Sequence, residues 1–147
     1  MTFVWSLTEL DAVFRQCWDE QTCDPAVPWD DGNPAAGHCG VTSMAVAELS
    51  GGVLLCSEVF RRDGQRDGLH YWNRLPSGIE VDLTRDQFRA GEQFGPASAH
   101  EPIRLPTARM ATRYDLFASR VRARLGGPLP EGIPISGSGC SVLTQTD

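Results

Sequence analysis

Three residues of the chain have the types and the order that a thiol enzyme requires, namely Cys39, His70 and Asp82. Cys39 follows a segment rich in Gly and Pro and opens a stretch of helical character, so we expect it at the N-terminus of a helix. The unpaired amides and the dipole of a helix N-terminus stabilise an anion, which favours the nucleophilic thiolate. His70 is then the expected base, and Asp82 the group that orients the imidazole.

Each of these residues also has an ordinary structural interpretation when it is taken alone. A free cysteine is commonly a buried small side chain, a lone histidine on a strand is commonly structural, and an aspartate at a strand end commonly caps a turn. The spacing favours the catalytic interpretation. His70 and Asp82 lie on either side of a Pro76-Ser77-Gly78 turn, and a three-residue loop in an antiparallel hairpin places them on one face, diagonal to each other.

An acyl-transfer site also needs hydrogen-bond donors for the oxyanion. The backbone amide of Cys39 is one expected donor. The side chain of Asn33 is a second candidate, although an asparagine before Pro34 is also a common turn residue. His38 is either a second titrating group beside the thiol or a histidine on the loop surface.

Two tryptophans are candidates for the walls of the substrate cleft. Trp72 is two residues from His70 on the same expected strand, so the two side chains share a face. Trp29 lies in the Pro-rich loop before Cys39 and would form a wall or a lid. For both residues the alternative is packing in the core.

Zinc binding is the chemical alternative for the cysteines and histidines of this chain. The residues that would have to ligate the metal are Cys17, Cys23, His38, Cys39 and His70. No pair of them has the CxxC or HExxH spacing of common zinc sites, so the sequence predicts no metal and no other cofactor.

The elements that must position these residues are predicted from apolar periodicity and turn residues. We expect helices over 7–18 and 39–49, strands over 53–60, 69–75 and 79–83, and a last helix from Thr107 to 125. Helices followed by strands and a closing helix predict an α+β fold in one domain over residues 1–125. Residues 126–147 are rich in Gly, Pro and Ser and are expected to form a C-terminal tail.

Composition and charge exclude several classes of function. The net charge is −6 and the 13 basic residues, all Arg, form no clear basic stripe, so we expect no nucleic-acid binding. No segment has the length and hydrophobicity of a membrane span, and the N-terminus lacks the features of a secretory signal. We therefore expect a cytoplasmic protein whose five cysteines are free thiols.

The segments NPAAGHCGVTSMAVAELSGG and GLHYWNRLPSGIEVDLTRDQF resemble the YunG-like family of small bacterial proteins, with its blocks NPxxGQC, TA, GG, HYWN and DLTxxQF. The resemblance covers roughly residues 5 to 125. The matching positions are Asn33, Pro34, Gly37, Cys39, Thr42, Gly51, Gly52, His70, Tyr71, Trp72, Asn73, Asp82, Leu83, Thr84, Gln87 and Phe88. The chain departs from the pattern at His38, where the family commonly has Gln, and this change would alter an oxyanion hole or a substrate pocket.

More broadly, a cysteine at a helix start followed by His and Asp on adjacent strands resembles the papain-like and transglutaminase-like superfamily. The resemblance implies a core with N-terminal helices packed on an antiparallel sheet, and it places Asn33 where papain-like enzymes have a Gln donor. It implies cysteine-dependent hydrolysis or transfer of an acyl group from a small-molecule or peptide amide or thioester. This class includes peptidases, amidases, deamidases and amide-forming acyltransferases. The alternatives are a binding module that keeps the fold without chemistry, and a secreted deamidase-like toxin.

Overall fold

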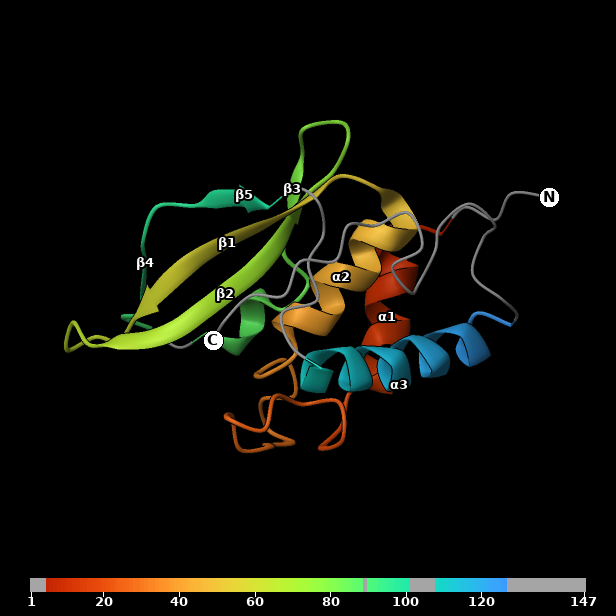
Figure 1. Cartoon of the computed structure of the whole chain (residues 1–147), viewed down its shortest axis with the longest axis horizontal. Helices are drawn as coiled ribbons and strands as arrows, with labels where there is room; N and C mark the ends of the chain where they lie inside the picture. Colours follow the sequence, from red (N-terminus) through yellow and green to blue (C-terminus); the bar gives the residue numbers. More distant parts are fainter. Residues whose placement is uncertain (1–4, 89, 101–107, 127–147) are drawn as a thin grey trace.

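A computed structural model describes residues 5–88, 90–100 and 108–126 of the chain. Its elements are α1 (Leu7–Cys17), α2 (Cys39–Ser50), β1 (Val53–Phe60), β2 (Arg66–Arg74), β3 (Glu80–Val81), η1 (Arg85–Gln87), β4 (Gln93–Phe94), β5 (Ser98–His100) and α3 (Ala108–Arg124). Figure 1 shows α1, α2 and α3 gathered on one side of a curled antiparallel sheet, with α2 next to the strands. The architecture is therefore α+β, as the order of the elements predicts.

Helix α1 begins at a capping box, as the Ser6 and Glu9 spacing predicts. The Ser6 hydroxyl accepts a hydrogen bond from the Glu9 amide at 3.1 Å, and the Glu9 carboxylate accepts one from the Ser6 amide at 2.7 Å. The apolar stripe of α1 is buried, and Phe14 packs on Phe117 of α3 with ring centroids 5.4 Å apart. This contact joins the N-terminal helix to the last one.

Helix α2 is buried along most of its length, because residues 41–48 all lie in the interior. Its small side chains allow close packing on both sides. On the sheet side, Asn73 of β2 donates a hydrogen bond from Nδ2 to the Ser43 carbonyl at 2.8 Å. The helix ends where Gly51 takes a φ of +75°, a conformation that glycine adopts without strain. These contacts fix the N-terminus of α2, which carries Cys39, relative to β2.

The sheet has the strand order β3-β2-β1-β4, and β5 also pairs with β1. Strands β1 and β2 form a long antiparallel hairpin in which His70 pairs with Ser57. The turn between β2 and β3 is closed by hydrogen bonds from the Leu75 amide to the Ile79 carbonyl and from the Gly78 amide to the Leu75 carbonyl, both 2.8 Å. The predicted three-residue turn over 76–78 is therefore confirmed.

Two of the predicted strands have different bounds in the structure. β2 begins at Arg66, three residues earlier than expected, and β3 is restricted to Glu80–Val81. β3 ends early because the Asp82 carboxylate accepts a hydrogen bond from the Thr84 amide at 3.2 Å, which turns the chain into η1. The short strands β4 and β5 were not predicted, since two or three residues carry no readable periodicity.

Helix α3 buries one face against α1 and α2, and its buried residues are Met110, Tyr114, Phe117, Ala118 and Val121. The Tyr114 hydroxyl donates a hydrogen bond to the buried Glu48 carboxylate at 2.9 Å. Burial raises the pKa of Glu48 to about 7. The predicted N-cap Thr107 and the predicted tail from residue 127 onward lie outside the described residues. None of the described helices combines the length and the hydrophobicity of a membrane span.

Candidate active site

The structure brings Cys39, His70 and Asp82 together. His70 is only 1% exposed, and its Nε2 lies 2.6 Å from Oδ2 of Asp82. The Cys39 side chain is a hydrogen-bond partner of the same imidazole. Because Asp82 engages Nε2, we assign Nδ1 as the ring nitrogen that faces the thiol. The three side chains thus form a continuous chain of polar contacts.

Local structure explains this placement. Cys39 is the first residue of α2, so its amide has no acceptor within the helix. In the β2–β3 ladder Asn73 pairs with Val81, and continuing this register by one residue puts Asp82 opposite Trp72. Asp82 is therefore diagonal to His70, as the turn length predicts. Its contact with the imidazole follows from the register of one hairpin.

The environment of His70 favours its charged form. Burial lowers the pKa of the imidazole, but hydrogen bonds and charge interactions with Asp82 and Cys39 outweigh burial and raise the pKa to about 9. His70 is then an imidazolium at neutral pH. An adjacent imidazolium favours the thiolate form of a cysteine, which is the reactive form. The ring is held in place by Trp72, which stacks on it at 5.6 Å, and by Phe88, which contacts it edge-on at 4.6 Å.

Gln87 is a residue of the site whose role we did not predict from the sequence. Its Nε2 lies 3.4 Å from Nδ1 of His70 and donates a hydrogen bond to the Thr84 carbonyl at 3.0 Å. Gln87 also lines the cleft that contains Cys39. The position belongs to the DLTxxQF block, but only the tertiary fold of η1 brings the amide to the imidazole.

Asn33 has a structural partner in the fold. Its Nδ2 donates a hydrogen bond to the backbone carbonyl of Gln87 at 3.0 Å, which links the loop before α2 to η1. The predicted role of Asn33 as an oxyanion donor stays a prediction, which requires the second N–H of the amide. The observed contact holds the two walls of the site together.

His38 is buried, so the expectation of a loop-surface histidine is wrong. The side chain is 0% exposed and its two ring nitrogens are engaged, Nδ1 with the Pro34 carbonyl at 2.7 Å and Nε2 with the Thr22 hydroxyl at 2.8 Å. Since a carbonyl only accepts, Nδ1 carries the proton and Nε2 accepts from Thr22. Burial lowers the pKa of His38 to about 4, so the ring is neutral at neutral pH. His38 thus holds the loop that leads into α2.

The His38 environment predicts an acid-sensitive fold. Its pKa is depressed from 6.5 to about 4, so protons bind the unfolded chain more readily in this range and stability is lost as pH falls from 6.5 toward 4. We expect a loss of about 3 kcal/mol from this residue. His38→Gln keeps one donor and one acceptor but does not titrate. Urea unfolding at pH 6.5 and at pH 4 measures the free energy of unfolding at both ends of the range. This free energy should fall less in the variant than in the native chain, and an equal fall in both would contradict the prediction.

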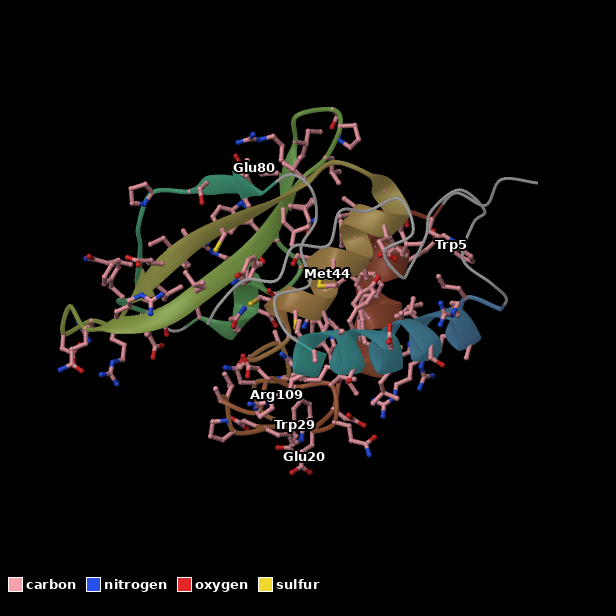
Figure 2. The ribbon with its side chains drawn as sticks, in the orientation of Figure 1. Trp5, Glu20, Trp29, Met44, Glu80 and Arg109 are labelled. Carbon is pink, nitrogen blue, oxygen red and sulfur yellow. The ribbon has the colours of Figure 1, made fainter. Side chains whose placement is uncertain are left out.

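The two tryptophans have different surroundings. Trp72 stacks on His70, as their shared strand face predicts, and its Nε1 donates a hydrogen bond to Glu80 at 2.8 Å. Trp29 contacts the His38 ring edge-on at 5.8 Å. Figure 2 shows Trp29 in the loop, away from the sheet. Trp72 therefore supports the imidazole directly, whereas Trp29 supports the loop before α2.

Cys39 faces a cleft of about 680 Å³. The cleft is formed by the loop before α2, the first turn of α2, strand β2, η1 and the first turns of α3. Among the described cysteines, Cys39 is half-buried, whereas Cys17, Cys23 and Cys56 are buried. Burial raises the pKa of these three thiols. Cys39 is therefore the described thiol that a molecule in the cleft can reach.

The described residues contain no group of three His, Cys, Asp or Glu side chains arranged to hold a metal ion. Of the cysteines and histidines named in the zinc alternative, Cys39 and His70 contact each other, whereas Cys23 and His38 have partners elsewhere. Cys23 donates to the Val27 and Ala36 carbonyls at 3.4 Å, and the ring nitrogens of His38 are engaged as described above.

Comparison with known proteins gives a consistent assignment. A family model described as "YunG protein" matches residues 6–126. The chain belongs to the YunG family. A relative within the curated proteins is "Uncharacterized protein YunG" of Bacillus subtilis (strain 168), which is 25% identical over 91 residues, covering 60% of this chain and 70% of the relative. No solved structure matches the chain significantly. The YunG match spans every residue of the site described above.

Proposed function

We propose that this YunG-family protein is a cysteine-dependent enzyme that hydrolyses an amide or thioester or transfers its acyl group, with Cys39 as nucleophile, His70 as base and acid, and Asp82 as the orienting group. The proposal rests on the series of contacts from Asp82 through His70 to Cys39. Cys39 itself lies at a helix N-terminus and lines a cleft. This arrangement has the geometry that activates a thiol.

In the proposed reaction the Cys39 thiolate attacks the carbonyl carbon, forming the C–S bond while the carbonyl electron pair moves to oxygen. When this intermediate collapses, the bond to the leaving amine or thiol breaks, and the leaving group takes the proton from Nδ1 of His70. Water or an amine then attacks the acyl-enzyme, gives its proton to His70, and releases Cys39. Asp82 orients His70 in every step and stabilises the imidazolium when the ring is charged.

Negative charge on the carbonyl oxygen needs hydrogen-bond donors close to Cys39. We propose the backbone amides of Cys39 and Gly40, because both residues line the cleft and belong to the first turn of α2. Amides in the first turn have no acceptor within the helix, and the helix dipole adds to their effect. The second N–H of Asn33 is a further candidate.

We also propose that the core is of the papain-like or transglutaminase-like kind. In support, the nucleophile begins a buried helix packed against an antiparallel sheet, and the base and the orienting carboxylate come from the adjacent β2–β3 hairpin region. A small-molecule or peptide acyl donor is the proposed partner. The proposed location is the cytoplasm, where reduced thiols persist, and the described cysteines are free.

The thiol itself provides the first test. With limiting iodoacetamide at neutral pH, Cys39 should be alkylated about tenfold or more faster than Cys17, Cys23 or Cys56, because it is accessible and lies next to an imidazolium. Peptide mapping of the native protein measures all four rates at once. Similar rates at Cys39 and the buried cysteines would count against a catalytic thiol.

The acyl group is best identified by mass. Incubation with a panel of acyl thioesters and amides, followed by intact mass measurement, should reveal an acyl adduct that is absent from Cys39→Ser. An adduct that persists in Cys39→Ser would assign the reaction to another residue. Alkylation without any acyl adduct from a broad panel would favour the binding module that retains the fold.

A further inference from the structure

The cleft beside Cys39 contains an arginine whose hydrogen-bonding capacity is only partly used. Arg113 lines the cleft, and its buried Nε has no hydrogen-bond partner among the residues that the structure describes. Its Nη2 reaches only the sulfur of Met110, at 3.1 Å, which is a weak acceptor. A buried guanidinium N–H without an acceptor is unfavourable, and such groups in native proteins normally have a partner. The site therefore favours a ligand that supplies an acceptor.

Arg109 lies one helical turn before Arg113 and lines the same cleft. Neither arginine forms an ion pair with another described residue, whereas Arg120 on the same helix pairs with Asp19 at 2.9 Å. Figure 2 shows Arg109 at the end of α3 that is next to the loop before α2. Two guanidinium groups on adjacent turns thus face the cleft without a carboxylate partner from the described chain.

These arginines lie close to the nucleophile because α3 packs on the first turn of α2. A Cβ on Gly40 would come within 2.1 Å of the Met110 side chain, so Gly40 and Met110 are in direct contact. Gly40 is the residue after Cys39, and Met110 lies between Arg109 and Arg113 along the helix. The close approach of α2 and α3 therefore places the arginines on the wall of the cleft next to the thiol.

The charge interactions of Arg113 follow from the same proximity. Burial is the main effect on both residues, and it raises the pKa of Cys23 and lowers that of His38. The positive charge of Arg113 acts in addition and lowers the pKa of each residue. Both residues belong to the loop that leads into Cys39. The Arg113 charge therefore acts on the region from which the nucleophile emerges.

The acidic residues of the cleft belong to other parts of its wall. Asp24 directs its carboxylate to the Ala26 amide at 3.0 Å, within its own loop. Asp67 and Glu92 come from β2 and from the segment before β4, the strand side of the cleft. Arg66, also on that side, pairs with Glu58 at 3.2 Å. The α3 wall is thus the positively charged side of the cleft.

We infer that Arg109 and Arg113 form a subsite for an anionic group, a carboxylate, on the acyl substrate of Cys39. This inference rests on the proposed function and adds the chemical class of the substrate. A carboxylate offers two acceptor oxygens, which match the planar donor sets of the two guanidinium groups that line the cleft.

The test compares two alkylating agents that differ mainly in charge. Iodoacetate carries a carboxylate, and iodoacetamide of nearly the same size is neutral. Both react by the same displacement, in which the thiolate forms a C–S bond and iodide leaves. The ratio of their rates at Cys39, divided by the ratio for a small free thiol, should favour iodoacetate about tenfold, as expected for charge-assisted hydrogen bonds. This ratio should fall several-fold in Arg113→Gln and in Arg109→Gln.

Arg124→Gln is the matched control, because Arg124 is on the same helix but does not line the cleft, and its guanidinium contacts Gln16 and Cys17 of α1. The normalised ratio of the iodoacetate rate to the iodoacetamide rate at Cys39 should be the same in Arg124→Gln as in the native chain. Arg109 is exposed, so its replacement tests the subsite even if Arg113→Gln folds poorly. A reactive Cys39 with no preference for iodoacetate, or a preference unaffected by either variant, overturns the subsite and leaves the proposed function standing. A Cys39 as unreactive as the buried cysteines overturns both.

Discussion

Replacing His70 with Gln is expected to slow the alkylation of Cys39 at neutral pH by about tenfold or more. In the native chain Asp82 and Cys39 overcome the effect of burial and hold the pKa of His70 at about 9, so the imidazole is charged and favours the thiolate. Without this charge a cysteine of ordinary pKa, about 8.5, is ionised to only a few per cent at neutral pH. The measurement is the rate of iodoacetamide incorporation at Cys39 by peptide mapping.

The pH dependence of the rate distinguishes this effect from loss of structure. In the native chain the rate should depend only weakly on pH from neutral pH up to about pH 8, below the pKa of about 9 at which His70 loses its charge. In His70→Gln it should rise steeply over the same interval, as the unassisted thiol ionises. His38→Gln is the matched control, since His38 is also a buried histidine but its ring nitrogens contact Thr22 and Pro34. Parallel profiles in the native chain and His70→Gln would exclude His70 as the partner of the thiol.

Replacing Asp82 with Asn should lower turnover by about a thousandfold while leaving the melting temperature within a few degrees of the native value. Oδ2 of Asp82 accepts from Nε2 of His70 at 2.6 Å. An amide at this position can direct an N–H toward the imidazole and so favours the wrong tautomer, and it does not stabilise the imidazolium. The measurement is the rate of acyl-enzyme formation with a substrate found by mass, together with thermal unfolding.

Asn is the informative substitution because Asp82 has two roles in the structure. Its Oδ1 accepts hydrogen bonds from the amide and the hydroxyl of Thr84, at 3.2 and 3.3 Å, and so shapes the turn into η1. Asp82→Ala would remove this cap as well as the contact with His70, and would therefore reduce both stability and activity. The side-chain oxygen of Asn can keep the cap. A large stability loss with unchanged acylation in Asp82→Asn would make Asp82 a structural residue only.

The sequence alone determined the elements and contacts that depend on local rules. The capping-box spacing of Ser6 and Glu9 predicts the start of α1, and a Gly51-Gly52 pair predicts a helix end at the place where α2 ends. The contact of His70 with Asp82 followed from one hairpin, because the length of a tight turn fixes which residues on the two strands are diagonal. Each of these predictions involves residues that are close along the chain, where few conformations compete.

Only the tertiary structure decided which distant segments surround those residues. The burial of His38 depends on Thr22 and on Trp18, whose ring stacks on it at 5.3 Å, and the contact of Gln87 with the imidazole depends on how η1 folds back. The Arg113 guanidinium beside the cleft depends on the close packing of α3 against Gly40. Such contacts are set by which surfaces pack together across the whole domain, and they leave no fixed spacing in the sequence. Local pattern therefore fixed the helices and the hairpin, whereas packing between remote elements determined the walls and the charge of the cleft.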